Sequence, residues 1–273
     1  MAGIDYVKLR ANLDASVVTP YIGPSGGTTL GITDIHQPLP AELNNTGGTS
    51  AVIMAAEAIS WADWDFGVSE SETNNEPSMA DISTYEEFGQ YNYGGGISFF
   101  QPLENDDPSN VLSVVKELTK VDLNQDIAIR VDGNKSNATP AANGDYISVF
   151  RTTSTAVENP FTPGESKRRT VTFVENGDFA HYTVVGPHTL VAVPPATAPW
   201  ASGKKARLRV TVQGRDYTNA TPIRFTSSNS AVVAIGPGGV YTVTGAAGTS
   251  ATITITDTDA NTTTTVNVTV TAP

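Results

Sequence analysis

Three histidines and several closely spaced carboxylates are the residues of this chain whose types could support catalysis or bind a metal. A nucleophilic triad or a zinc site needs histidine beside other catalytic or ligating groups. His36, His181 and His188 stand apart in the sequence, a pattern that favours neither site. His181 falls within a predicted strand, where a structural role is the better interpretation. The chain contains no cysteine, which excludes disulfides and thiolate metal sites.

The spacing of the carboxylates predicts surface positions rather than a hydrolytic centre. Asp63/Asp65 and Glu86/Glu87 have the residue type of a glycosidase pair, but such pairs are common on protein surfaces. The aromatic content of 8% is low for an enzyme that stacks sugars on aromatic platforms. The acidic pair in residues 257–259 lacks the twelve-residue pattern of a calcium loop, so we interpret it as a turn. We predict no enzymatic activity, no cofactor and no metal.

The charge distribution divides the chain into two parts. Residues 1–185 contain ten Lys/Arg and twenty-five Asp/Glu, a net charge of −15, whereas residues 186–273 contain six and three, a net charge of +3. This break predicts one domain at 1–185 and a second at 186–273, which begins with a proline-containing connector at 186–203. The acidic body disfavours tight nucleic-acid binding, because phosphate contacts come from Lys and Arg.

The ends and the apolar runs predict a soluble protein that is made in a cytoplasm. The opening residues lack the basic start and apolar run of a secretory signal. No stretch approaches the ~18–20 apolar residues that a transmembrane helix needs, so we expect no membrane partner.

Short strand-like runs separated by turn residues fill the second part. Apolar and polar residues alternate, as in Leu208 to Val212, and threonine occupies most polar positions of the run 251–256. The spacing predicts a seven-stranded β-sandwich. The predicted strands lie at about 189–193, 208–212, 222–226, 231–235, 240–244, 251–256 and 266–270.

The order of these features resembles the group 2 bacterial immunoglobulin-like domain. The resemblance is carried by Val193-Pro194-Pro195, Gly203, the step Phe225 to Asn229, the turn Gly239-Val240, and Gly248 to Ile253. Phe225 stands where that family commonly has Trp. The resemblance implies surface display or weak glycan binding, with Lys204, Lys205, Arg207 and Arg209 as candidate contacts. The alternative is a solvated strand face on a domain that has no ligand.

The first part is also predicted to be mainly β, with one α-helix. Strands are expected at 127–131 and 146–152, followed by a hairpin of 169–175 and 178–185 around Asn176-Gly177. The strand at 91–100 contains Gly94 to Gly96, which indicates a bulge or a close backbone approach. Cap-type residues at 107–109 and helical spacing of apolar residues predict a helix up to Lys120. The run 51–60 fits a helix or a strand, and we favour a strand from Glu57 onward.

Two stretches, 18–48 and 69–87, are predicted to be long loops. The first is rich in Gly, Pro, Thr and Asn, and the second carries many charges around Pro77. Loops of this length are uncommon in a compact domain unless they have a role, such as contact with neighbouring subunits. Plain disorder is the alternative for the first loop.

The first part as a whole resembles the major tail tube proteins of bacteriophages with long, non-contractile tails. The resemblance rests on Gly23 to Thr29, on the strand 62–66 with its loop 69–75, and on the closing strand 144–151. A Gly-x-Tyr-x-Gly-x-Phe strand lies between them, here Gly89, Tyr91, Tyr93, Gly95, Phe99 and Phe100. A carboxy-terminal immunoglobulin-like domain is a common appendage in that family.

The resemblance implies a virion protein whose copies form stacked hexameric rings around a channel for DNA ejection. It also implies contact with other tail proteins, such as the tape measure and the tail terminator. A negative channel wall repels phosphate, and this agrees with the acidic body. Candidate channel or inter-subunit acids are Glu70, Glu72, Glu76, Asp81, Glu86 and Glu87.

Two other functions fit parts of the sequence. A glycan-binding adhesin or capsid-surface fibre would use the second domain as its working part and would remain a monomer or trimer. A cell-wall hydrolase would use the first domain and would turn over peptidoglycan.

Overall fold

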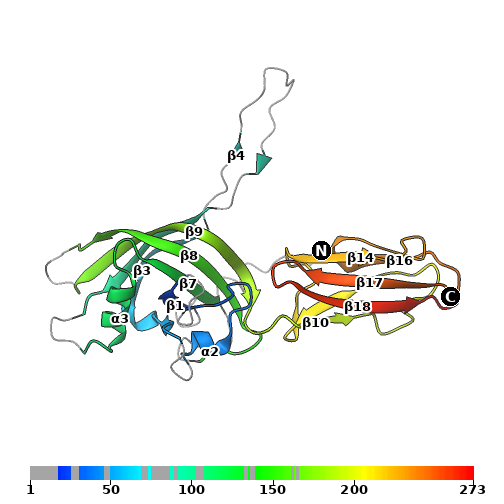
Figure 1. Ribbon diagram of the computed structural model, residues 1–273, viewed down its shortest axis with the longest axis horizontal. Helices are drawn as coiled ribbons and strands as arrows, with labels where there is room; N and C mark the ends of the chain where they lie inside the picture. The colour runs from blue at the N-terminus through cyan, green and yellow to red at the C-terminus, as the bar shows by residue number, and fades with distance from the viewer. Residues whose placement is uncertain are drawn as a thin grey trace, which may run out of the picture. The chain divides into compact units, whose positions relative to one another are not determined.

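The computed structural model describes residues 18–25, 31–45, 50–68, 73–74, 87–88, 92–102, 107–131, 135, 139–160, 163 and 166–273. Its contacts divide the chain into two compact units. Unit 1 lies within residues 1–141 and 145–183, and unit 2 consists of 142–144 and 184–273. Both are built mainly of β-strands, so the predicted fold class is confirmed (Figure 1).

Unit 1 is built on a seven-stranded sheet with the order β2-β1-β7-β8-β9-β6-β3. The strands are β1 (Val18–Pro24), β2 (Ile53–Met54), β3 (Ile59–Val68), β6 (Tyr93–Phe100), β7 (Asn124–Val131), β8 (Tyr146–Glu158) and β9 (Arg168–Val184). A separate pair joins β4 (Thr73–Asn74) to β5 (Glu87–Phe88). Figure 1 shows β8 and β9 as long, strongly bent strands.

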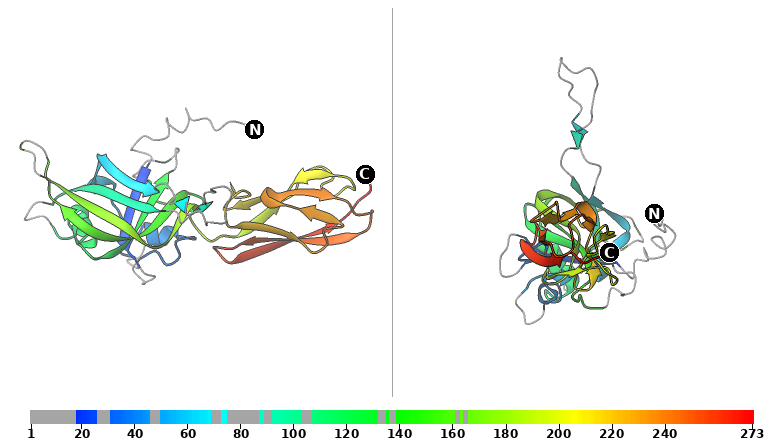
Figure 2. Two further views of the ribbon diagram at one scale, coloured as in Figure 1. Left: turned by 90° about the horizontal axis from the view of Figure 1, so that it is seen from above. Right: turned by 90° about the vertical axis from the view of Figure 1, so that its right-hand side faces the viewer.

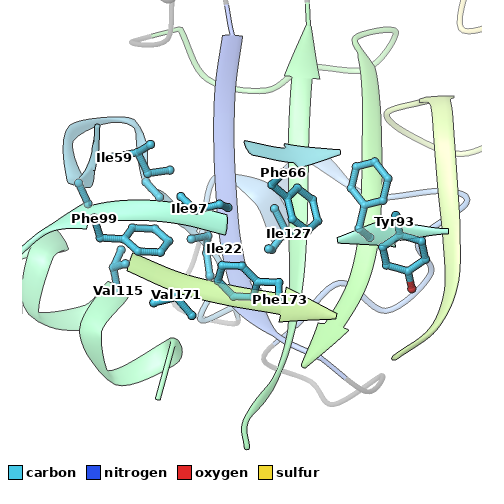
Figure 3. Close-up of a cluster of buried hydrophobic side chains, with 13 residues drawn as sticks. Ile22, Ile59, Phe66, Tyr93, Ile97, Phe99, Val115, Ile127, Val171 and Phe173 are labelled. Atoms are coloured by element: carbon cyan, nitrogen blue, oxygen red, sulfur yellow. The ribbon is translucent and has the colours of Figure 1, made fainter. Parts of the chain in front are cut away.

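Aromatic side chains fill the core on one face of this sheet. Phe66 meets Phe150 and Phe173 edge to face, with ring centroids 5.4 and 6.0 Å apart. Ile22 and Ile127 complete the cluster from β1 and β7 (Figure 3). Such T-shaped pairs favour a fixed ring geometry in addition to the burial of apolar area.

The predicted helix is confirmed as α3 (Val111–Leu118), which covers part of the core through Val115. Its N-cap is Asn110, whose side chain accepts a hydrogen bond from the Leu112 amide at 3.0 Å. The C-cap is Thr119. A polar N-cap satisfies one of the amides that the first turn leaves without an intrahelical partner.

The predicted close approach at the glycine run is also confirmed. Gly95 has φ +120°, and a Cβ there would lie 1.8 Å from the carbonyl oxygen of Asp65 on β3. At Gly94 a Cβ would lie 2.8 Å from the Phe173 carbonyl oxygen on β9. Glycine therefore allows β6 to fit between its two neighbours.

The predicted hairpin at 169–185 is wrong, because β9 is a single strand from Arg168 to Val184. Its first half pairs with β6, from Phe100↔Arg168 to Gly94↔Val174, and β8 is its other neighbour in the sheet. Because β6 and β8 pair with β9 on its two sides, its backbone groups have partners without a hairpin. Gly177 has φ +110° inside the exposed stretch 174–178, so Asn176-Gly177 marks an irregularity within the strand.

The stretch 18–48, predicted as a loop, contains two regular elements. Strand β1 lies between β2 and β7, and its register with β7 runs from Val18↔Val131 to Pro24↔Gln125. The short helix α2 (Pro40–Leu43) follows, with Pro40 in its first turn. The strand expected from Glu57 begins instead at Ile59, after the 3₁₀ turn Ala56–Ala58.

Unit 2 contains nine strands in three three-stranded sheets (Figure 2). They are β10 (Leu190–Val193), β12 (Arg209–Val212) and β13 (Arg215–Asp216); β11 (Lys205–Arg207), β16 (Val240–Val243) and β15 (Val233–Ile235); and β14 (Ile223–Ser227), β17 (Ser250–Asp257) and β18 (Thr262–Thr269). Alternate residues of β17 are buried, which confirms the two-residue period expected there.

Unit 2 has two strands more than the seven predicted. The run 205–212 is divided at Leu208, whose amide donates to the Gly239 carbonyl at 2.8 Å, so β11 and β12 enter different sheets. Strand β13 is added after the turn at Gln213-Gly214. The predicted connector 186–203 contributes β10 to the sheet of β12, and Trp200 packs on Tyr241 with ring centroids 4.8 Å apart.

Candidate assembly and binding surfaces

The three histidines make separate structural contacts. His36 Nε2 lies 2.7 Å from Asp178 Oδ2, and His181 Nδ1 lies 3.1 Å from Ser148 Oγ. Burial lowers the pKa of His181. His188 is buried against Asp257 within unit 2, at 2.9 Å. Groups of three or more His, Asp or Glu side chains that could hold a metal are absent from the described part of the chain.

A buried polar cluster lies at β1 and β7, on the face of the sheet opposite the aromatic core. Arg130 is fully buried and donates to Thr19 Oγ1 at 2.9 Å, and its Nη1 lies 3.5 Å from Asp145 Oδ2. Lys135 pairs with the same carboxylate. Sequence reasoning did not find this cluster, because its members come from β1, β7 and the segment before β8.

Asp126 is a second buried carboxylate on this face. It lies on β7 opposite Arg151 of β8, whose Nε is 3.7 Å from Asp126 Oδ1. Burial raises the pKa of Asp126 to about 6, although the nearby Ser25 side chain and the charge of Arg151 act in the opposite direction. The carboxylate therefore carries a desolvation cost that its partners offset only in part.

The sheet of unit 1 ends at β2 and β3. Strand β3 pairs with β6 alone, and β2 covers only Tyr21 and Ile22 of β1. Beside β2 is a cavity of about 360 Å³, lined mainly by apolar residues that include Leu43, Val52 and Met54. Within the described ranges no other strand of the chain covers either edge. These edges can accept strands from another molecule.

Most of the predicted acidic residues lie outside the described residues. This holds for Glu70, Glu72, Glu76, Asp81 and Glu86. Glu87 lies in β5, where its backbone pairs with Asn74. Of the carboxylate pair considered above, Asp65 is exposed on β3.

Two of the four predicted glycan contacts, Arg207 and Arg209, already have partners within unit 2. Arg207 donates to the Gly238 carbonyl at 2.8 Å, and Arg209 forms an ion pair with Asp216 at 3.0 Å. Lys204 and Lys205 precede them, with Lys205 on β11, while Arg209 belongs to β12 of another sheet. The two arginines are thus used in local contacts of unit 2.

These features define a β-sheet protein whose notable surfaces are open sheet edges. A family model described as phage tail tube protein matches residues 22–188, which is more than half of the chain and covers most of unit 1. The chain belongs to the phage tail tube protein family. It is thus a structural component of the virion tail that assembles into a tube and associates with other tail proteins. No curated protein was found to match the chain. Among the described residues, no helix is long and apolar enough to cross a membrane.

Proposed function

We propose that this chain is the major tail tube subunit of a phage with a long, non-contractile tail, and that its copies form stacked hexameric rings. The observation that carries the proposal is the match of residues 22–188 to the tail tube family, over a unit whose sheet ends in two open edges. Pairing of such edges between copies satisfies backbone groups that a single copy leaves to water. A ring closes when the last edge meets the first.

The channel of the proposed tube conducts DNA during ejection. The acidic balance of residues 1–185 supports this role, because a negative wall repels phosphate and does not trap the DNA. Glu70, Glu72, Glu76, Asp81, Glu86 and Glu87 are the acids that we assign to the channel or to subunit contacts. The tape measure and tail terminator proteins are the further partners of the proposed tube.

Unit 2 is proposed to be a group 2 bacterial immunoglobulin-like domain that the tube displays on its outside. Its three small antiparallel sheets and its near-neutral charge support a separate module with its own core. Leu208, Val210 and Tyr241 are among the buried residues of that core. A contact of Lys204 and Lys205 with a host surface glycan remains part of the proposal.

Electron microscopy of the concentrated full chain tests the assembly. We expect rings or tubes, with a sixfold average in end-on views. Val68→Lys, at an exposed position on edge strand β3, is expected to reduce assembly, because lysine on a strand edge disfavours edge pairing. Val191→Lys, at an exposed position of unit 2, is the matched control.

Dispersed monomers or trimers at every concentration would overturn the tube proposal. Combined with glycan binding by unit 2, that result would favour an adhesin. Turnover of peptidoglycan by the purified chain would favour the hydrolase.

A further inference from the structure

Four cations of unit 1 have a carboxylate partner among the described residues. Arg130 and Lys135 share Asp145, Arg151 faces Asp126, and Lys120 pairs with Glu117. Three cations differ, because no carboxylate of the described residues lies within 4.0 Å of Lys116, Lys167 or Arg169. In a body with twenty-five Asp/Glu against ten Lys/Arg, such cations are unexpected.

Lys116 and Arg169 lie on one cavity where α3 ends and β9 begins, and Lys167 precedes Arg169 by two residues. Arg169 is only 7% exposed, and its Nη2 donates to the carbonyl oxygen of Thr119, the C-cap of α3, at 2.6 Å. Lys116 is in the last turn of the same helix. The carbonyl oxygen of Lys167 accepts a hydrogen bond from the Gln101 amide at 3.0 Å, which places this residue beside the end of β6.

A cavity of about 340 Å³ opens between these elements. It is lined by Gln101, Pro102, Lys116, Asn159 and Arg169. Its two charged groups are cations, and its amides belong to Gln101 and Asn159, which hydrogen bond to each other. Carboxylate oxygens are the acceptors that ammonium and guanidinium groups bind most strongly in proteins.

Electrostatics around Arg169 agree with a missing negative partner. Burial lowers the pKa of Arg169, and the charge of Glu117 opposes this effect. The α3 carboxyl end supplies partial negative charge through Thr119, but Glu117 itself pairs with Lys120. A carboxylate in the cavity would complete the neutralisation.

We propose that this cavity, the cationic cavity, binds a carboxylate side chain from the acidic stretch 69–87 of a second copy of this chain. The inference rests on the proposed assembly and names one of its contacts. Charge complementarity selects the occupant, because residues 69–87 contain six Asp/Glu and no Lys or Arg. A neutral or basic segment would leave the cations of the cavity without a partner.

Lys116→Glu in the full chain tests the contact, because Lys116 is exposed and lines the cavity without holding α3 in place. We expect the concentration of half-assembly, measured by light scattering, to rise about tenfold. Lys120→Glu is the control, since it makes the same charge change just beyond the C-cap of α3, outside the cavity lining. It is expected to have a much smaller effect.

A second chain variant tests the occupant. Conversion of the six acids of 69–87 to their amides is expected to weaken assembly to a similar extent. A chain that carries both these amides and Lys116→Glu is expected to assemble no less well than a chain with either change alone. Conversion of the same acids to lysine should restore assembly of Lys116→Glu in part. The inference would be overturned if Lys116→Glu and Lys120→Glu assembled equally well. It would also be overturned if the effects of Lys116→Glu and of the amide substitutions on assembly were fully additive.

Two further outcomes separate the inference from its alternatives. A wild-type chain that never assembles contradicts the proposed function itself, whereas normal assembly of both wild type and Lys116→Glu contradicts the cationic cavity alone. In another outcome, Lys116→Glu lowers the melting temperature of the dispersed subunit and leaves assembly unchanged. That outcome would assign the cavity to a carboxylate of the same copy. Glu104, Asp106 and Glu165 are near it in sequence and would be the candidates.

Discussion

His188 and Asp257 form a buried pair in unit 2, with Nδ1 of the imidazole 2.9 Å from Oδ2 of the carboxylate. The other ring nitrogen lies 3.1 Å from the carbonyl oxygen of Val184. Both partners are acceptors, so both bonds form only when each ring nitrogen carries a hydrogen. Oδ1 of the same carboxylate accepts from the amides of Asp259 and Ala260 at 3.1 Å. The pair thus joins the first residues of unit 2 to the turn after β17.

Asp257→Asn is expected to lower the free energy of unfolding of unit 2 by about 3 kcal/mol, because it removes one charge of a buried pair. Calorimetry of the full chain, with the unit 2 transition assigned from a chain that lacks unit 2, measures the loss. Asp259→Asn removes an exposed carboxylate of the same turn and should change stability by less than about 0.5 kcal/mol. Equal effects of the two substitutions would contradict a special role for the pair.

The same pair predicts a loss of unit 2 stability in acid. Burial alone would raise the pKa of Asp257, but the hydrogen bonds from His188, Ala260 and Asp259 outweigh it and hold the pKa below its usual value. A carboxyl group with a lowered folded-state pKa stabilises the fold above its unfolded pKa of about 3.9, and this contribution disappears as the pH falls further. Unit 2 should therefore lose stability below about pH 4, and Asp257→Asn should reduce that loss.

Gly95→Ala should disrupt the pairing of β3 with β6. The new Cβ would lie 1.8 Å from the Asp65 carbonyl oxygen, at a position with φ +120°, so we expect a destabilisation of about 3 kcal/mol or more. Urea unfolding of unit 1 measures it. Gly96→Ala is the control, because its Cβ would meet only Thr170 Cγ2, at 3.8 Å. A stable Gly95→Ala variant would show that this close approach is not required for the fold.

The sequence predicts those parts of unit 1 that depend on local patterns. The helix α3 follows from its cap residues and spacing, and the glycine run follows from the rarity of glycine inside strands. Strand β1 was missed because Pro20, Gly23 and Pro24 are typical of loops, yet neighbours on both sides hold it in the sheet. Tertiary pairing overrides local preference in such cases.

Contacts between distant residues account for the remaining errors. The dipeptide Asn176-Gly177 is typical of a hairpin, but β6 and β8 supply the partners of β9 from elsewhere in the chain. The cationic cavity combines Gln101, Lys116, Asn159 and Arg169, which share no local motif. The sequence shows cations at 116 and 167–169, but only the fold shows that Lys116 and Arg169 line one cavity.

Asp126 predicts a pH dependence of opposite sign in unit 1. Its folded-state pKa of about 6 exceeds the unfolded value of about 3.9, so the folded state binds more protons between these values. Stability contributed by this group is therefore greatest below about pH 4 and falls by about 2–3 kcal/mol as the pH rises to about 6. Asp126→Asn should flatten the urea-unfolding free energy of unit 1 over this range. Asp65→Asn, at an exposed carboxylate, should keep the wild-type slope, and an unchanged slope in Asp126→Asn would contradict the assignment.

Deletion of residues 186–273 separates the two proposed roles of the chain. The two open edges, β2 and β3, and the cationic cavity all belong to unit 1, which has its own aromatic core. We therefore expect the shortened chain to fold and to assemble into tubes of smaller outer diameter, with a concentration of half-assembly close to that of the full chain. Electron microscopy measures the diameter, and circular dichroism checks that the body is folded. A folded body that no longer assembles would show that unit 2 contributes contacts between subunits, and its role as a displayed appendage would have to be abandoned.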